Sequence, residues 1–206
     1  MTGIIAQNVG RTSGLIKAAS GGGAWTKIKE ITASADSEIS FVDGTDDVVL
    51  DGTYPIYVFK FINIHPETDG AGLTFQASTD SGSSYGVTAT TTLFRASHYE
   101  DDSSTDLSYD TGNDQAQSTS FIKLTAGIGN DNDKCGVGNI FIFNPSSTTF
   151  VKHFMCTGQI VEDSDVSKET FCSGYFNTTS ALDAFQFKII SDNMDSGDIC
   201  LYGISS

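Results

Sequence analysis

Hydrophobic and polar residues alternate through most of the chain from Trp25 to the end of the sequence. In Ser37–Val42 (SEISFV), Ile39 and Phe41 fall on one side of an extended backbone, and the residues between them fall on the other. This period of two is typical of a β-strand with one buried face. The same pattern, bounded by turn residues, predicts further strands at Leu73–Ser78, Gly86–Arg95, Ser120–Ala126, Gly138–Phe143, Phe150–Cys156, Thr170–Phe176, Phe185–Ile190 and Ile199–Ile204.

The segment Pro55–Ile64 (PIYVFKFINI) differs from these strands because it is apolar on both faces. A strand with two apolar faces is typical of the centre of a sheet that is covered on both sides. We therefore expect this segment to be a central strand. The residues expected on one face are Tyr57, Phe59 and Phe61, and those expected on the other are Ile56, Val58, Ile62 and Ile64, with Lys60 among them.

About ten strands separated by turn residues predict an all-β fold, namely an antiparallel, jelly-roll-like β-sandwich. No window carries a sustained run of apolar residues at helical spacing, and only Ser180–Ala184 is expected to form one short helical turn. The composition agrees, because only 18% of the residues are charged and 21 are glycines. Two long polar loops are expected, at Glu100–Gln117 and at Gly127–Gly136.

The first residues of the chain form a different kind of segment. Met1–Gly23 contains no acidic residue, and it ends in three glycines that make a flexible joint. We expect an extended arm at residues 1–24 and a single β-sandwich domain at residues 25–206. The arm is either a disordered tail or an anchor that docks on another subunit. The residues that would make the anchoring or oligomer contact are Ile4, Ile5, Val9, Arg11, Leu15, Ile16 and Lys17.

The charge balance narrows the range of partners. The net charge is −15, from 26 acidic and 11 basic residues. Such a surface repels phosphate backbones and anionic lipid headgroups, so we expect no binding to nucleic acid. No apolar run reaches the roughly 18–20 residues of a membrane span, so no membrane insertion is expected. The N-terminal stretch lacks the features of a signal peptide, so a mature form outside the cell would require release by lysis.

The four cysteines, at positions 135, 156, 172 and 200, are far apart in the sequence and form no C-x-x-C pair. Disulfide frameworks occur in shorter chains with denser cysteine. We expect these residues to be reduced and to serve as small core residues.

One short motif suggests an enzyme. Gly82–Gly86 (GSSYG) fits the G-x-S-x-G pattern of a hydrolase nucleophile elbow, with Ser84 as the nucleophile. That elbow requires a helix after the serine, but the following residues, VTATTTLF, favour a strand. Asp, Ser and Gly at this point are typical of a turn between strands. We therefore interpret Ser84 as a turn residue and expect no catalytic residue there.

Metal and cofactor motifs are equally weak. No two of the histidines, at positions 65, 98 and 153, lie at the sequence spacing that is typical of metal ligands. Asp131–Gly136 begins like a calcium loop, but Cys135 and Ile142 stand where the fifth and twelfth ligands would be. No cofactor is expected. A structural Ca²⁺ at Glu100–Asp114 or Asp192–Asp198 is the remaining alternative to solvated turn acids.

Carbohydrate chemistry has only general support. No pair among the acidic residues stands out as the two carboxylates of a glycosidase. Trp25 and the tyrosines can stack on sugar rings, although aromatic residues at this density more often form cores and interfaces. Trp25 is therefore kept as a candidate glycan contact.

Four stretches, taken in order, resemble a module found in virion proteins of tailed bacteriophages, particularly phages of marine cyanobacteria and related hosts. They are Trp25–Ser34 (WTKIKEITAS) followed by ISF, Asp51–Pro66 (DGTYPIYVFKFINIHP), Leu73–Tyr85 (LTFQASTDSGSSY) and Ser196–Ile204 (SGDICLYGI). The resemblance implies an antiparallel β-sandwich used in tail appendages, fibres or other particle surfaces. It implies no catalytic residue.

The resemblance leads to an expected function. The chain is expected to be a non-enzymatic virion structural protein of a phage tail or tail appendage, attached through its N-terminal arm. The expected partners are other virion proteins and further copies of the chain, with a trimer favoured. A capsid decoration (cement) protein and a host-glycan-binding module for receptor recognition are the alternatives. Assembly in the host cytoplasm and release by lysis would place the protein in the virion.

Overall fold

The computed structural model describes residues 25–205, and within them it contains twelve strands and no helix. The all-β prediction is therefore confirmed. The helical turn expected at Ser180–Ala184 is wrong. The backbone N–H groups of Leu182 and Asp183 donate instead to the carbonyl oxygens of Pro145 and Ser78, at 2.9 and 3.1 Å. These long-range bonds take the place of the local bonds that a helical turn requires.

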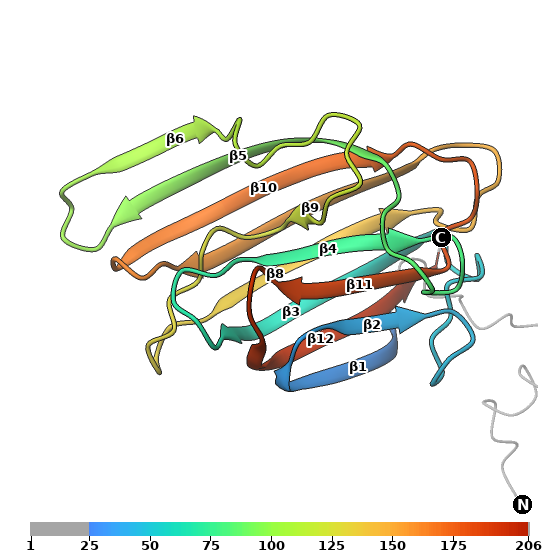
Figure 1. The fold of residues 1–206 in the computed structure, drawn as a ribbon, viewed down its shortest axis with the longest axis horizontal. Coiled ribbons are helices and arrows are strands. Elements are labelled where there is room, and N and C mark those ends of the chain that lie inside the picture. The colour runs from blue at the N-terminus through green and yellow to red at the C-terminus, as the bar shows by residue number, and fades with distance from the viewer. Residues whose placement is uncertain (1–24, 206) are drawn as a thin grey trace, which may run out of the picture.

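The strands form two antiparallel sheets, as the sandwich prediction requires (Figure 1). The larger sheet has eight strands, in the order β1 (Trp25–Asp36), β12 (Met194–Ile204), β3 (Ile56–Pro66), β8 (Gly136–Phe143), β9 (Lys152–Val161), β10 (Val166–Phe176), β5 (Ala89–Tyr99) and β6 (Thr105–Tyr109). The smaller sheet has four strands, in the order β2 (Ile39–Val42), β11 (Ala184–Ile189), β4 (Leu73–Ser78) and β7 (Ile122–Lys123).

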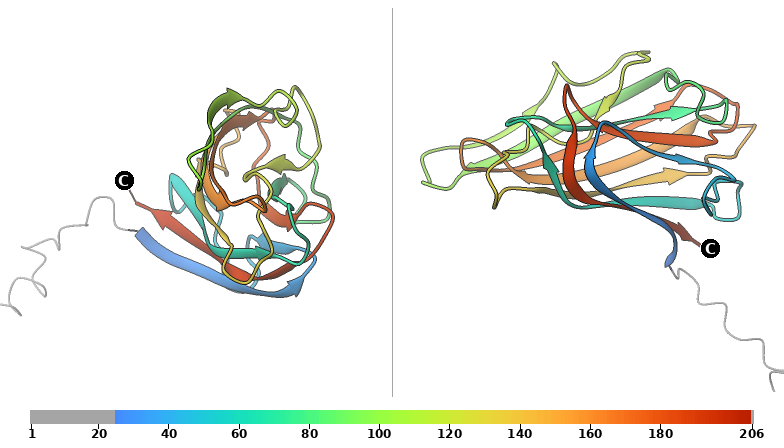
Figure 2. Two further views of the ribbon diagram at one scale, coloured as in Figure 1. Left: turned by 90° about the vertical axis from the view of Figure 1, so that its left-hand side faces the viewer. Right: turned by 60° about the horizontal axis from the view of Figure 1, so that its bottom comes forward.

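The chain passes repeatedly from one sheet to the other. It leaves the larger sheet for β2, β4, β7 and β11 in turn and returns after each of them. These repeated crossings are the jelly-roll-like feature of the fold. Figure 2 shows the larger sheet curving around the smaller one. The crossings place strands that are distant in the sequence on opposite sides of one core.

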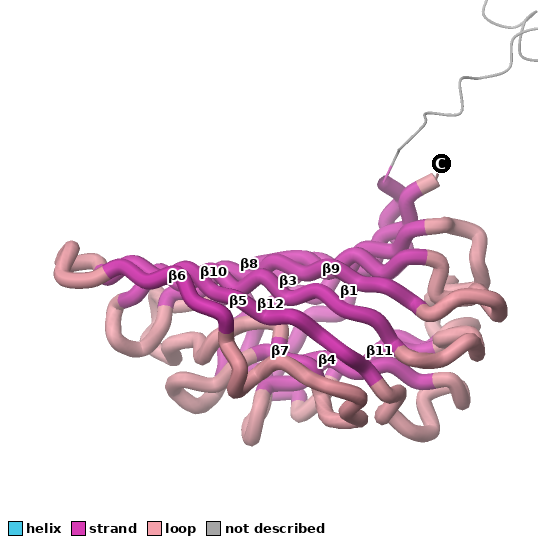
Figure 3. Tube along the Cα trace, turned by 90° about the horizontal axis from the view of Figure 1, so that it is seen from above, coloured by secondary structure: helices cyan, strands magenta, loops and turns pink. Residues whose placement is uncertain are grey.

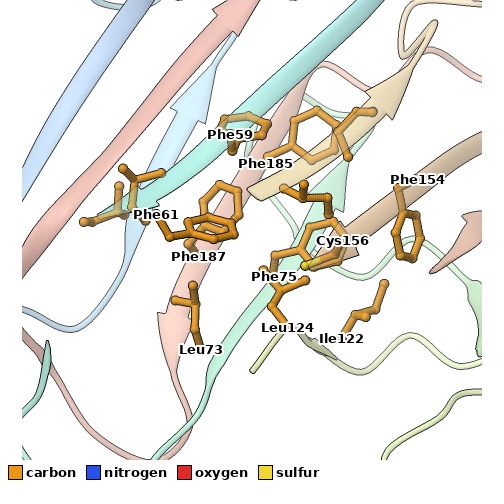
Figure 4. Close-up of a cluster of buried hydrophobic side chains, with 14 of the residues drawn as sticks. Phe59, Phe61, Leu73, Phe75, Ile122, Leu124, Phe154, Cys156, Phe185 and Phe187 are labelled. Carbon is orange, nitrogen blue, oxygen red and sulfur yellow. The ribbon is translucent and has the colours of Figure 1, made fainter. Parts of the chain in front are cut away.

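Phenylalanine side chains fill the space between the sheets (Figure 4). Phe59 on β3 packs against Phe185 and Phe187 on β11, with ring centroids 5.5 and 4.9 Å apart. Phe75 on β4 lies 5.2 Å from Phe154 on β9, in edge-to-face geometry. All five rings are fully buried. Each aromatic pair adds about 0.5–1.5 kcal/mol to the burial of its area, so these contacts hold the two layers together.

β3 is an interior strand of the larger sheet, the third of eight, between β12 and β8, and the smaller sheet covers one of its two faces (Figure 3). The expectation that Ile64 shares the face of Ile62 is wrong. Ile64 is buried in the core, whereas Ile62 is 40% exposed. Asn63 has a positive φ of 52°, and the pairing of β3 with β8 shifts register at this point, as in a β-bulge. The bulge turns Ile64 inward.

Gly197 on β12 faces this bulge and has a φ of +120°. A Cβ atom at position 197 would lie 2.7 Å from the carbonyl oxygen of Asn63, so only glycine fits there without a shift of the backbone. The bulge in β3 therefore requires a glycine at this point of β12. A bulge of this kind bends the strand that carries it.

The Glu100–Gln117 segment is not wholly a loop, because it contains β6. Tyr109 on β6 pairs with Phe94 on β5, and Leu107 pairs with Ala96. The acidic residues obscured the strand pattern of β6 in the sequence. An edge strand has no neighbouring strand on one side, and its acidic side chains remain in water there. Strands β9, β10 and β12 also extend beyond their predicted limits, whereas β7 is only two residues long.

We predict that Phe59→Ala lowers the free energy of unfolding by about 3–5 kcal/mol, because it opens a cavity among buried aromatic rings. Phe150→Ala is the matched control. Phe150 is 72% exposed, so its loss should change stability by less than about 0.5 kcal/mol. Urea titration followed by circular dichroism measures both values. Equal effects of the two substitutions would contradict the role of Phe59 in joining the layers.

Candidate interaction surface

The larger sheet has an outer face, defined here as the side turned away from the four-stranded sheet. Figure 3 shows the smaller sheet and most of the loops on one side of the larger sheet, with no described strand over the other side. The alternation of β8 shows how this face arises. Ile140 and Ile142 point into the core, and Phe141 and Phe143 therefore point outward.

A depression of about 730 Å³ lies on this outer face. We call it the apolar depression, because its lining contains no charged residue. Met155 lies in it and is 58% exposed, and Phe94 is 41% exposed. The side chains that line it are Ile56, Phe94, Asn139, Phe141, Phe143, Met155, Thr157, Phe171 and Ser173, and Cys156 and Cys172 contribute atoms to its floor.

Strand register brings these residues together. Phe141 on β8 lies directly opposite Met155 on β9, and Phe171 on β10 lies directly opposite Phe94 on β5. The rings of Phe94 and Phe171 stack at 4.7 Å with an interplanar angle of 10°. Contiguous apolar surface on a protein that is otherwise acidic is a mark of an interaction site. The depression is therefore the strongest candidate for a binding surface among the described residues.

Trp25, the sequence candidate for glycan contact, lies at one end of the same outer face. Its ring is 43% exposed and lies 5.7 Å from the ring of Tyr202 and 6.2 Å from that of Phe141. The ammonium group of Lys60 is 4.8 Å from the centre of the Trp25 ring. This cation–π contact occupies part of the ring surface on which a sugar would stack. Trp25 is thus an exposed aromatic residue at the margin of a larger apolar surface.

The other candidate residues, Ile4, Ile5, Val9, Arg11, Leu15, Ile16 and Lys17, lie outside the described residues. Sequence reasoning did not identify Phe94, Met155 or Phe171 as surface residues. The sequence carried little signal, because each of them is a large apolar residue among mostly polar ones on the outward side of its strand.

Ser84 lies in a tight polar turn. Its hydroxyl donates to Asp80 Oδ2 at 2.6 Å, and its backbone N–H donates to Asp80 Oδ1 at 2.9 Å. The residues after it run without a helix into β5, so the local structure differs from a nucleophile elbow. The hydrogen bonds from Ser84 and Ser78 lower the pKa of Asp80 to about 2. This geometry agrees with the interpretation of Ser84 as a turn residue.

The histidines have partners of their own at other places in the fold. His65 Nδ1 lies 3.5 Å from an Asp195 carboxylate oxygen, and His98 Nε2 lies 3.1 Å from one of Asp102. His153 lies beside the ring of Tyr175. None of these contacts brings a histidine to Ser84.

Within residues 25–205, no group of three or more His, Cys, Asp and Glu residues is arranged to hold a metal ion. The loop at Asp131 instead surrounds an ammonium group. Lys134 Nζ lies 3.0 Å from Asp131, 2.9 Å from Asp165 and 2.8 Å from the carbonyl oxygen of Asp163. These hydrogen bonds raise the pKa of Lys134 above its usual value. A tethered lysine thus supplies positive charge to a loop that resembles a calcium site in sequence.

The acids of Glu100–Asp114 are also engaged in local contacts. Asp110 pairs with Arg95 at 3.2 Å and accepts a bond from Asn113 at 2.9 Å, and Asp114 accepts one from Tyr109 at 2.8 Å. These contacts hold the acids beside β6, and the carboxylates of Glu100–Asp114 do not converge on one point. The fit to a bound Ca²⁺ is poor at this loop.

All four thiols are free; three are buried, and Cys135 is half-buried. Cys156 and Cys172 lie directly opposite each other on β9 and β10. Burial raises the pKa of Cys172 to about 12, so this thiol stays protonated at neutral pH. Apart from Cys135, the cysteines occupy the buried positions expected from the sequence.

In comparisons with known proteins, no family model, curated protein or solved structure matched the chain. No helix in the described part of the chain is long and apolar enough to cross a membrane.

We predict that Ser84→Ala raises the pKa of Asp80 from about 2 toward 3.8, because it removes the strongest hydrogen bond to that carboxylate. The folded-state pKa of Asp80 is lower than its unfolded value. Its contribution to stability is therefore present above about pH 4 and is lost as the pH falls through about 2. Carboxyl NMR titration measures the shift, with Ser83→Ala as the control. An Asp80 that titrates normally in the unmodified protein would contradict this turn geometry.

Proposed function

We propose that this chain is a non-enzymatic structural protein of a tailed-phage virion. It is a component of the tail or of a tail appendage and is attached through its N-terminal segment. The ordered resemblance from Trp25 to the end of the sequence supports this proposal. The observation that carries it is the uncovered outer face of the larger sheet, which offers apolar area for assembly. Monomeric proteins rarely leave large apolar patches in contact with water.

The position of the N-terminal junction supports the same role. Trp25, the first described residue, pairs with Ile204 near the end of β12, so both ends of the described chain lie at one end of the sheet. The hairpin of β5 and β6 lies at the opposite end (Figure 3). A domain held by a segment before Trp25 would therefore turn the β5–β6 end away from its attachment point.

Charge distribution agrees with attachment by this segment. Residues 25–206 hold all 26 acidic residues and nine of the 11 basic ones, for a net charge of −17. Residues 1–24 hold the other two basic residues, Arg11 and Lys17. Opposite charges on segment and body favour contacts between copies, so we infer a homo-oligomer, with a trimer as the leading state. Assembly takes place in the host cytoplasm, and lysis releases the particle.

We predict that deletion of Met1–Gly23 yields a folded protein that no longer enters the particle, because the anchoring segment is missing. Phage carrying the deletion is purified, and the protein is measured by mass spectrometry and by immunogold labelling of intact particles. Replacement of the same residues by a Gly/Ser segment of equal length controls for chain length. Normal incorporation of the deleted form would overturn the proposal, and labelling on the head would identify a capsid decoration protein instead.

A further inference from the structure

We propose that the apolar depression receives the N-terminal segment of a neighbouring copy of this chain, with the aliphatic residues between Ile4 and Ile16 as the occupants. This inference rests on the proposed function, in which copies associate through that segment. It identifies the receiving site, which the resemblance does not specify.

The chemistry of the depression matches an aliphatic segment. Its lining includes Phe141 and Phe171, and Met155 is a flexible thioether that adapts to branched side chains. Asn139, Thr157 and Ser173 supply polar groups that can bond the backbone of an extended chain. A site with apolar walls and few polar groups suits a peptide that carries isoleucine, leucine and valine.

Charge decides between this segment and the body of a second copy as the occupant. Two bodies of −17 each repel at close approach, and the depression has no charged residue to offset that repulsion. The segment before Trp25 is the part of the chain with a positive net charge, from Arg11 and Lys17. It brings apolar side chains to the depression and lowers the charge of the surrounding surface at the same time.

The length of the segment is sufficient. Eight residues lie between Ile16 and Trp25, and the nine steps from one Cα atom to the next cover at most about 30 Å in an extended chain. Four strand spacings separate β1 from β9, which carries Met155, and at about 4.8 Å each they span about 19 Å. The segment can therefore cross from the edge of a sheet to the depression.

The proposed function favours a neighbouring copy over the same copy, because in it the copies associate through this segment. A segment from one copy in the depression of the next is a head-to-tail contact. Repetition of this contact gives either an open filament or a closed ring. A trimer is a small ring of this kind.

The first test places a photoreactive phenylalanine analogue at Met155 in the full-length protein. Copies labelled with heavy nitrogen are mixed with unlabelled copies before irradiation, and cross-linked peptides are identified by mass spectrometry. We expect cross-links from position 155 to residues 1–23 of a different copy. The same analogue at Ile190, which is 41% exposed on the other side of the molecule, should give none. Cross-links from position 155 only to its own chain, only to residues 25–206 of another copy, or to nothing would overturn the proposal.

The second test uses two full-length variants, Ile16→Asp in the segment and Met155→Glu in the depression. Each should weaken self-association by about tenfold or more, because each buries an unpaired carboxylate. Mixing them pairs the intact segment of the Met155→Glu form with the intact depression of the Ile16→Asp form, so dimers should appear in analytical ultracentrifugation. Failure of the mixture to form dimers would overturn docking between copies.

These tests separate the inference from the proposed function. If they fail while deletion of Met1–Gly23 still prevents incorporation into the particle, the docking site is wrong and the structural role stands. If the deleted form is incorporated normally, the structural role itself is wrong.

Discussion

Packing of phenylalanine rings between the two sheets determines which residues of this protein face water. Phe59 contacts Phe187 across the layers, and Phe75 contacts Phe154 in the same way. Once these rings point inward, the pleat of each strand sends its next residue outward. Met155 follows Phe154 in β9 and is exposed for this reason. The outer face is thus a direct consequence of the core, and a shift of one residue in any strand would exchange the two.

Charge repulsion and hydrophobic attraction act in opposite directions at the outer face. The acidic surface keeps bodies of this protein apart, whereas the apolar depression favours contact. At an ionic strength near 0.15 M, the repulsion between exposed charges extends only about 8 Å, but the hydrophobic contribution is not screened by salt. The proposed docking of a basic, aliphatic segment satisfies both conditions, because the segment would cover apolar surface with less acidic surface than a second body would bring. On the proposed docking, this balance accounts for a domain with a net charge of −17 and an N-terminal segment without acids in one chain.

The sequence was sufficient for the fold class and for the placement of β3 inside a sheet, because these depend on local periodicity. The sequence did not predict that the Ile64 side chain points into the core. That direction follows from the bulge at Asn63, which depends on the register with β8 and on Gly197, more than 130 residues away. The sequence missed β6, because edge strands tolerate acidic residues. The depression was beyond its reach because register across five strands brings its residues together. The turn at Ser84 was predictable from its neighbours, since turn chemistry is local.

Cryo-electron microscopy of the intact phage particle, at a resolution that traces strands, shows directly what contacts the outer face. We predict that this domain is present in the particle and that protein density covers Phe141, Met155 and Phe171, with an extended chain in the depression. An outer face that is open to solvent in every copy, or a particle without this domain, would contradict the assembly role.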